Sequence, residues 1–219
     1  MEIELVHTAD GSDTLYVKSL DEHYHSTHGA LQESVHVFVN AGLANSKSDP
    51  IALFEVGFGT GLNAILAYRY AVAHQIRVCY HGIEKYPLAA AVIAHLNYAS
   101  FLSAGEQQVF EQLHSVAWNC SHEIGPYFEF RKTDADLLLY EPSEKYNLIF
   151  MDAFSPNKQA EMWADSVFEK LASITTSGGE LVTYTAKGDV KRSLRKAGFR
   201  VKRLVGPPGK RNMIRATKL

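Results

Sequence analysis

Residues 53–63 carry the groups whose types and spacing say most about chemistry. An apolar run holds one acid, and three glycines then alternate with other residues. Glycine adopts positive φ easily and lets a ligand approach the backbone with no Cβ in the way. The free N–H groups of a helix starting near Gly61 would suit a carboxylate or a phosphate. This order predicts a nucleotide-type pocket. The predicted contact residues are Glu55, Gly57, Phe58, Gly59, Thr60, Gly61 and Asn63.

The glycine spacing separates two cofactor classes. A dinucleotide fingerprint has glycine at its first, third and sixth positions, whereas this loop has glycine at the first, third and fifth, and Leu62 at the sixth. Glu55 would repel a pyrophosphate but attract the sulfonium and ammonium groups of S-adenosylmethionine. We therefore expect an S-adenosylmethionine loop. The alternative is a glycine-rich turn that binds nothing.

Further acids close the other central strands that the sequence predicts. Glu84 follows Gly61 by 23 residues, near the spacing at which an acid accepts hydrogen bonds from ribose hydroxyls, and Lys85 lies beside it. Asp134 is expected to bind the adenine amino group, and Ala135 to supply a backbone donor. An acid after a strand can instead cap the next helix, and that alternative stays open for Glu84.

Asp152 is the candidate that faces the methyl acceptor, besides contributing to the cofactor pocket. Methyl transfer from a sulfonium is a direct displacement, so the nucleophile must be aligned and its lone pair kept free. A carboxylate can bind the ammonium form of an amine and help to remove its proton. Phe154 and Pro156 would stiffen the following loop and offer a stacking surface. The alternative is that Asp152 only caps the next turn.

Hydrophobic periodicity predicts the elements that position these groups. Short apolar runs at 3–6 and 14–17 indicate a hairpin, and residues 30–43 have helical spacing. The predicted strands are 51–56, 76–83, 127–133, 146–152, 179–184, 199–204 and 212–217. The predicted helices are 61–73, 87–97, 106–116, 160–173 and 188–197.

Strands that alternate with helices predict an α/β fold with a mainly parallel sheet covered on both faces. The last two strands are joined by a short loop and must pair antiparallel. This layout is the Rossmann-like fold of class I S-adenosylmethionine-dependent methyltransferases, with a seven-stranded sheet and an antiparallel terminal hairpin. We expect an N-terminal hairpin and helix extension over residues 1–50 and a methyltransferase domain over residues 51–219.

The composition fits one globular catalytic unit of 219 residues, 46% hydrophobic and 21% charged. No apolar run approaches the roughly 20 residues of a membrane span, and the acidic start is unlike a signal peptide. Cys79 and Cys120 match neither a disulfide framework nor a zinc spacing. These features predict a cytoplasmic protein with no membrane partner.

The formal charge of -2 is unevenly distributed. Residues 187–219 hold twelve Lys or Arg and one acid, whereas residues 1–186 hold ten basic and twenty-three acidic residues. Such a basic segment beside a cofactor fold suggests a polyanionic substrate, since Lys and Arg neutralise phosphates. The alternative is a solvated basic face. His23, His25 and His28 have no matching Cys or His partners, so no metal site is predicted.

Several segments together carry a family resemblance. They are Glu55–Asn63, Met151–Pro156, Glu161–Trp163, Val190–Phe199, Gly209–Met213, Tyr24–Ser26 and Leu31–Ser34. In this order the chain resembles the methyltransferases of the MnmC/MnmD type, which modify the wobble uridine of tRNA. The resemblance implies transfer of a methyl group from S-adenosylmethionine to the amine of 5-aminomethyl-2-thiouridine, giving 5-methylaminomethyl-2-thiouridine.

The resemblance also implies substrate contacts and partners. Lys210 and Arg211 would grip the backbone of the anticodon stem-loop while the wobble base enters the pocket. The other implied substrate-binding residues are Tyr24, His25, Ser26, Gln32, Glu33, Phe154 and Pro156. In several relatives this domain is fused to a flavin-dependent oxidase that prepares the amine, and this sequence has no such domain. We therefore expect this chain to do only the methylation and a separate enzyme to supply the aminomethyl precursor. Asn212 departs from the family pattern, which usually has Glu there.

Two other classes of function remain open. The first is an enzyme of the same fold that acts on a small-molecule amine, either a methyltransferase or an aminopropyltransferase. The acidic rim suits it, but the basic segment does not. The second is a nucleic-acid-binding module without catalysis, which the intact Glu55, Glu84 and Asp152 disfavour. Binding of tRNA should weaken steeply with salt, whereas binding of a small amine should not.

Overall fold

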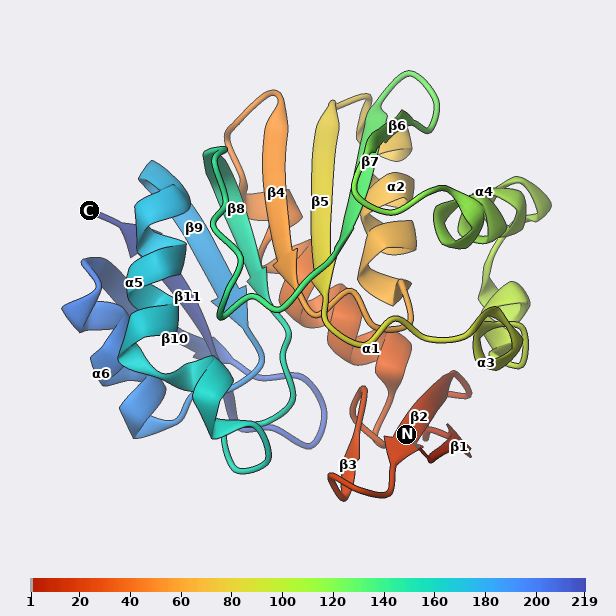
Figure 1. Cartoon of the computed structure of the whole chain (residues 1–219), viewed down its shortest axis with the longest axis horizontal. Coiled ribbons are helices and arrows are strands. Elements are labelled where there is room, and N and C mark those ends of the chain that lie inside the picture. Colours follow the sequence, from red (N-terminus) through yellow and green to blue (C-terminus); the bar gives the residue numbers. More distant parts are fainter. Residues whose placement is uncertain (1) are drawn as a thin grey trace.

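A computed structural model describes residues 2–219 and contains a large mixed sheet and a small antiparallel sheet (Figure 1). The order of the large sheet is β10-β11-β9-β8-β4-β5-β7-β6. Its strands are β4 (Ile51–Val56), β5 (Val78–Glu84), β6 (Ser121–Glu123), β7 (Phe128–Asp134), β8 (Tyr146–Met151), β9 (Thr175–Thr183), β10 (Phe199–Val205) and β11 (Asn212–Lys218). The helices around it are α2 (Leu62–His74), α3 (Ala90–Ile93), α4 (Ala104–Ser115), α5 (Asp165–Ile174) and α6 (Gly188–Lys196).

The five central strands run parallel, from β9 through β8, β4 and β5 to β7. The chain passes from β4 outward to β5 and β7, and then returns to the other side of β4 as β8. The order of the strands therefore reverses at β4. In open α/β sheets the ligand crevice forms at such a point, beyond the carboxyl ends of the strands.

Two hydrophobic clusters lie on opposite faces of the large sheet. Neighbouring residues of β4 point into different clusters, Leu53 into one and Phe54 into the other. The first cluster holds Ile65 of α2 and Phe110 of α4. The second holds Phe168 of α5, together with residues of α6. Burial on both faces explains why β4 reads as a continuous apolar run, as parallel strands do.

The fold class predicted from the sequence is confirmed, and the count of strands needs one correction. All seven predicted strands are present, and β10 and β11 form the antiparallel terminal hairpin. The sheet has eight strands and not seven, because β6 pairs antiparallel with the edge of β7. β6 has only three residues, of which His122 alone is partly covered, so no alternating pattern marked it.

Two of the helices predicted around the large sheet differ from the observed ones. Instead of one helix over 87–97, the chain forms only α3 and then a 3₁₀ turn at Asn97–Phe101. Two hydrogen bonds between Asn97 and Asp13, each 2.9 Å long, hold Asn97 against the N-terminal segment in place of a continued helix. The predicted helix over 160–173 is a 3₁₀ turn at Ala160–Trp163 followed by α5. The indole of Trp163 donates to the carbonyl of Phe154 at 2.7 Å, which holds that turn.

The N-terminal segment forms a small sheet and one helical segment. Its strands are β1 (Ile3–His7), β2 (Asp13–Val17) and the short β3 (Glu22–His23), all paired antiparallel. The predicted hairpin is thus present, with β3 added. The predicted helix over 30–43 consists of α1 (Ala30–Ser34) and a π-helical continuation, Val35–Asn40. The small sheet lies at the end of the large sheet where the parallel strands finish (Figure 1).

The extension shares the hydrophobic core of the rest of the chain. Leu15 of β2 and Phe38 of the π-helical turn belong to the cluster that contains Leu53 and Ile65. The division into residues 1–50 and 51–219 stays a prediction. Among residues 2–219, no helix has the length and apolar character needed to cross a membrane.

Candidate active site

A cavity of about 260 Å³ opens beyond the carboxyl ends of β4, β5 and β8, at the reversal of strand order. Its walls combine the glycine loop with residues from the N-terminal extension and from the loop after β8. The predicted residues that line it are Tyr24, His25, Gly57, Phe58, Gly59, Thr60, Asn63, Glu84, Lys85, Ala135, Asp152 and Phe154. Residues that are distant in the sequence are therefore brought to one site.

The glycine loop follows the path that its sequence requires. Gly57 has φ of 88°, and a Cβ at this position would lie 2.7 Å from the carbonyl oxygen of Asp152. Gly59 has φ of 50°, and a Cβ there would lie 3.1 Å from the ring of Tyr24. A side chain at Gly57 would therefore push the loop away from β8. The bare backbone leaves a cradle next to Asp152.

Hydrogen bonds connect three polar side chains, Glu55, Asn63 and Asp152, from the core to the cavity. Asn63 donates from Nδ2 to Glu55 at 2.8 Å and to Asp152 at 2.8 Å. Glu55 also accepts a hydrogen bond from the hydroxyl of Tyr80. Glu55 is only 1% exposed and does not line the cavity. Glu55 instead holds the side chain of Asn63 in place from the core side. Of the residues in this set, Asn63 and Asp152 are the ones that could touch the cationic donor expected for Glu55.

The surroundings of Glu55 and Asp152 favour the protonated forms of both acids. Burial raises the pKa of Glu55 well above its usual range. Burial also raises the pKa of Asp152 to about 8, and the charge of Glu33 adds to this effect. The hydrogen bond from Asn63 and the charge of Lys210 act in the opposite direction on the pKa of Asp152. A carboxyl group that titrates near neutral pH can both give and take a proton.

Glu84 is bound to the glycine loop. One of its oxygens accepts from the N–H of Gly59 at 3.0 Å, and the other accepts from the N–H of Tyr86 at 2.9 Å. Burial raises the pKa of Glu84, and these backbone hydrogen bonds oppose the rise. The alternative role of Glu84 as a helix cap is wrong, because Ala89 precedes α3 at the N-cap position.

The part of the cavity that was expected to bind adenine differs in detail from the expectation. Asp134 is exposed and does not line the cavity, whereas Asp136 and Leu137 do. Asp136 forms an ion pair with Lys85, with 2.8 Å between Lys85 Nζ and Asp136 Oδ2. Ala135 lines the cavity as expected. The contact of Asp134 with adenine stays a prediction, and Asp136 is a second candidate that the sequence analysis did not select.

The N-terminal extension forms the roof. The ring of Tyr24 meets the ring of Phe154 edge to face, with 5.0 Å between centroids. Lys158, which follows in the same loop as Phe154, pairs with Asp21 at 2.9 Å. His25 bonds to Thr14 at 3.3 Å, and burial lowers its pKa to about 4, so it is neutral at pH 7. The roof is therefore fastened to the loop after β8 by an ion pair and by aromatic packing.

Glu33 and Lys210 lie behind the cavity and do not line it. They form a partly buried ion pair, and Glu33 also accepts from the N–H of Ser26 at 2.8 Å. The ammonium of Lys210 lies 3.9 Å from the centre of the Tyr184 ring. Gln32 is exposed, and its N–H donates to Asp10 at 2.8 Å. Lys210 is thus paired with Glu33 and only partly exposed.

A second, shallower groove lies beside the cavity. Lys210 and Tyr184 form part of its wall, and Pro156, Arg211 and Lys187 form other parts. Of the residues predicted to bind substrate, Pro156, Lys210 and Arg211 therefore meet here and not in the cavity. Arg211 is exposed, so its guanidinium is available to a ligand.

The structure does not gather the three histidines of the N-terminal segment at one point. His23 packs against the ring of Tyr16 with 4.8 Å between centroids, His25 faces Thr14, and His28 lies against Gly209. The site residues that sequence analysis missed include Tyr184, Lys158 and Asp136. Tyr184 directly follows β9, so its place at a strand end was a signal that could have identified it.

Comparisons with known proteins bear on this arrangement. A family model described as S-adenosyl-L-methionine-dependent methyltransferase matches residues 128–219. A bifunctional protein for tRNA 5-methylaminomethyl-2-thiouridine biosynthesis, MnmC of Cupriavidus metallidurans, is 32% identical over 213 residues, which are 91% of this chain and 32% of the relative. MnmC of Ralstonia nicotianae is 32% identical over 88% of this chain and 31% of its own length. The chain thus spans about a third of these curated relatives.

Solved structures agree with the fold. MNMC2 from Aquifex aeolicus is 28% identical and superposes with a TM-score of 0.81, covering 99% of this chain and 70% of that one. Spermidine synthase from Thermotoga maritima is 12% identical with a TM-score of 0.58, and covers 100% of this chain and 80% of its own. The second likeness concerns the fold alone.

Proposed function

We propose that this chain, which belongs to the S-adenosylmethionine-dependent methyltransferases of the MnmC type, methylates the 5-aminomethyl group of the wobble uridine in tRNA. The product would be 5-methylaminomethyl-2-thiouridine. One observation carries the proposal: Asp152 faces the cavity at the point where strand order reverses, and its pKa is raised to about 8. A carboxyl group of this kind suits an acceptor that must lose a proton, which an amine does.

The residues around the cradle fit a cationic methyl donor. The buried Oδ1 of Asn63 has no hydrogen-bond partner among residues 2–219, although its Nδ2 has two. An ammonium group at the mouth of the cradle would satisfy this acceptor. When bound, S-adenosylmethionine supplies an electrophilic methyl group on a sulfonium. Glu84 would hold the ribose hydroxyls, and Ala135 with either Asp134 or Asp136 would hold the adenine.

Asp152 performs the proton chemistry in this proposal. Its carboxylate takes one proton from the ammonium form of the acceptor and leaves a neutral amine with a free lone pair. The neutral nitrogen would then bond to the methyl carbon as the bond from sulfur to that carbon breaks, giving a secondary ammonium ion and S-adenosylhomocysteine. The ammonium product would release its extra proton to solvent. Phe154 and Tyr24 would exclude water from the reacting groups.

The substrate would approach along the groove beside the cavity. Arg211 and Lys187 on its walls suit the phosphates that flank a nucleotide whose base enters the site. A separate enzyme would supply the aminomethyl precursor. Both cysteines are free thiols, which suits the reducing cytoplasm.

The test is methyl transfer in vitro. Undermodified tRNA with 5-aminomethyl-2-thiouridine should gain tritium from labelled S-adenosylmethionine, and mass spectrometry of the digested nucleosides should find the added methyl group on the wobble base. Spermidine and other small amines serve as competing acceptors. Turnover on small amines without turnover on tRNA would reject the proposal and favour the small-amine alternative.

A further inference from the structure

Glu33 and Lys210 come from two distant parts of the chain and form an ion pair outside the lining of the cavity. Glu33 belongs to α1, and Lys210 to the loop between β10 and β11. Side-chain exposure is 7% for Glu33 and 32% for Lys210, so the acid is buried and the lysine is partly exposed. A second link lies next to this pair: His36, in the π-helical turn after α1, bonds at 2.9 Å to the carbonyl of Val205 at the end of β10. The N-terminal extension therefore holds this loop in place beside the groove.

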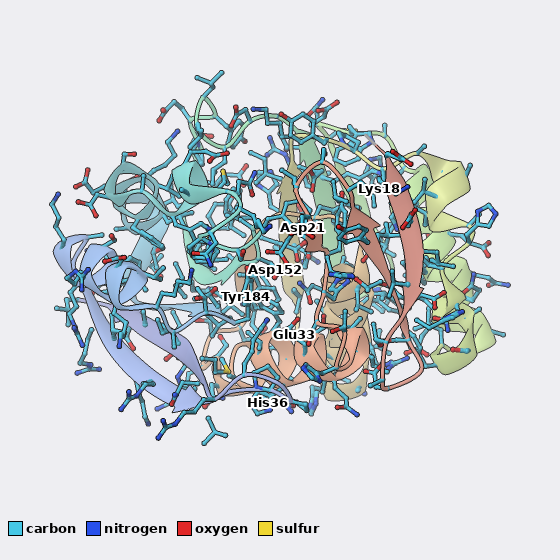
Figure 2. All side chains as sticks on the ribbon, turned by 90° about the horizontal axis from the view of Figure 1, so that it is seen from below. Lys18, Asp21, Glu33, His36, Asp152 and Tyr184 are labelled. Carbon is cyan, nitrogen blue, oxygen red and sulfur yellow. The ribbon has the colours of Figure 1, made fainter. Side chains whose placement is uncertain are left out.

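Continuous contacts lead from this pair to Asp152. Lys210 lies over the ring of Tyr184 at 3.9 Å, and the hydroxyl of Tyr184 donates to the carbonyl of Ala153 at 2.9 Å. Ala153 is the neighbour of Asp152 in the chain. Figure 2 shows Asp152, Tyr184 and Glu33 together near the centre of the molecule, seen from the side of the small sheet. The ion pair thus supports the loop that presents Asp152.

Several charged or titratable groups face Asp152 from the elements around it. Glu55 of β4 and Tyr80 of β5 lie on the core side, joined to it through Asn63 of α2. Tyr184, which follows β9, couples to Asp152 from the groove side. Glu33 and Lys210 contribute opposite charges from behind. Burial raises the pKa of Glu55 and of Tyr80, which favours their uncharged forms, whereas Glu33 and Lys210 face each other as an ion pair.

We propose that Glu33 and Lys210 are positioning residues for the methylation step: as one charge pair behind the Asp152 loop, they set the balance between the protonated and the ionised form of Asp152. The catalytic part of this inference rests on the proposed function. The effect of the two charges on the ionisation of Asp152 can be measured without turnover.

The two members of the pair act in opposite directions. The negative charge of Glu33 disfavours ionisation of Asp152, and the positive charge of Lys210 favours it. Glu33→Gln keeps the size of the side chain but leaves the lysine charge uncompensated, so Asp152 should ionise at lower pH. Lys210→Met leaves the Glu33 charge uncompensated, so Asp152 should ionise at higher pH. Removal of both should return the titration toward that of the wild type.

The primary test is a titration that needs neither substrate nor turnover. Protein labelled with ¹³C at the aspartate carboxyl carbons is titrated from pH 5 to pH 9.5 by NMR, and Asp152→Asn assigns the Asp152 signal by its loss. We expect a midpoint lower by about half a pH unit or more in Glu33→Gln, and higher by a similar amount in Lys210→Met. Lys187→Met is the matched control, since it removes a lysine from the same groove without touching Glu33, and should leave the midpoint unchanged.

The single variants leave a partly buried ion unpaired, so the double variant Glu33→Gln with Lys210→Met tests the pair where a single variant does not fold. Its midpoint should lie between those of the single variants, or close to the wild type if these do not fold. Midpoints that stay fixed, or that move in the same direction in both single variants, would overturn the inference. A double variant far from the wild-type midpoint would do the same.

Catalysis gives a second readout. If the wild type methylates tRNA, the acid limb of its pH–rate profile should move with the NMR midpoint in each variant, with the KM for S-adenosylmethionine unchanged. An acid limb that stays fixed while the midpoint moves would overturn the role in catalysis. A wild type that shows the expected titrations but no transfer to tRNA would instead reject the proposed function and leave the charge coupling established.

Discussion

At the scale of single residues, Asn63 explains how two acids can lie close together in this site. Its one amide nitrogen donates to both Glu55 and Asp152, so it joins the carboxyl groups without adding a charge. Burial raises the pKa of Glu55 well above its usual range, whereas Asp152 meets the cavity and its pKa is raised to about 8. Two similar side chains therefore acquire different roles from their surroundings, as acid and base pairs in enzymes do.

The first prediction concerns Asp152 as the base. Asp152→Asn keeps the shape of the side chain but cannot take a proton from an ammonium ion. Turnover should fall about 100-fold to 10,000-fold, the range that a general base contributes. Affinity for S-adenosylmethionine, measured by calorimetry, should stay within a few-fold. Near wild-type turnover in tritium transfer to tRNA would exclude this role.

The second prediction concerns stability. The folded protein raises the pKa of Asp152 to about 8, so between pH 4 and pH 8 the folded state keeps a proton that the unfolded chain releases. The free energy of unfolding must then decrease as pH rises through this window. Asp152→Asn removes this cost and should be more stable than the wild type by about 1 kcal/mol or more at pH 9. Urea unfolding at pH 5 and pH 9 measures the difference, which should be smaller at pH 5.

Residue types and spacing predicted the site residues that lie at the ends of strands. Asp152 and Glu84 could be found because parallel strands end at one edge of a sheet. The burial of Glu55 could not, because it depends on Asn63 and Tyr80, which come from other elements. The sequence predicts an RNA contact for Lys210 but not its ion pair with Glu33, because Glu33 lies 177 residues earlier in the chain.

At the scale of elements, periodicity predicted those whose apolar faces are buried by regular packing. The bounds of β4 match the expectation, because its run of apolar residues is buried on both faces. The expected helix over 87–97 was wrong where a long-range contact decided the structure. Its C-terminal half is redirected by the two hydrogen bonds between Asn97 and Asp13, a partner 84 residues away. A local pattern does not contain such a contact.

The third prediction concerns the roof. Tyr24, in the segment after β3, covers Gly59 and packs on Phe154. Tyr24→Ala would open the roof to water and should weaken binding of S-adenosylmethionine about tenfold, because most of an aromatic contact surface is lost. Tyr24→Phe keeps the ring and is the matched control, which should bind as the wild type does. Calorimetry measures both, and equal affinity for Ala and Phe would show that the roof does not touch the donor.

At the scale of the whole molecule, the basic C-terminal segment is only partly available for RNA. Several of its cations are committed to acids of the same protein, including Lys210 with Glu33, Lys196 with Asp165 and Arg215 with Glu180. The formal excess of charge that the sequence shows therefore overstates the free positive surface. The cations that can bind RNA are those next to the cavity, because a nucleobase can enter the cavity only where there is room for the phosphates that flank it.

The last prediction places that contact in the groove beside the cavity. Lys187→Glu combined with Arg211→Glu reverses two groove cations next to the loop after β8 while leaving the Glu33–Lys210 pair intact. The dissociation constant for tRNA should rise at least tenfold, and the slope of log K against log salt should become shallower by about 1.5 to 2, as expected for two lost phosphate contacts. Lys145→Glu is the matched control, because Lys145 precedes β8 at the opposite end of the sheet and bonds to the carbonyl of Ser173. It should leave both quantities near the wild-type values, and binding of S-adenosylmethionine should not change in any of these variants. If the two groove substitutions leave the salt dependence intact, the RNA must dock on another face, because a charge reversal cannot be neutral where a phosphate binds.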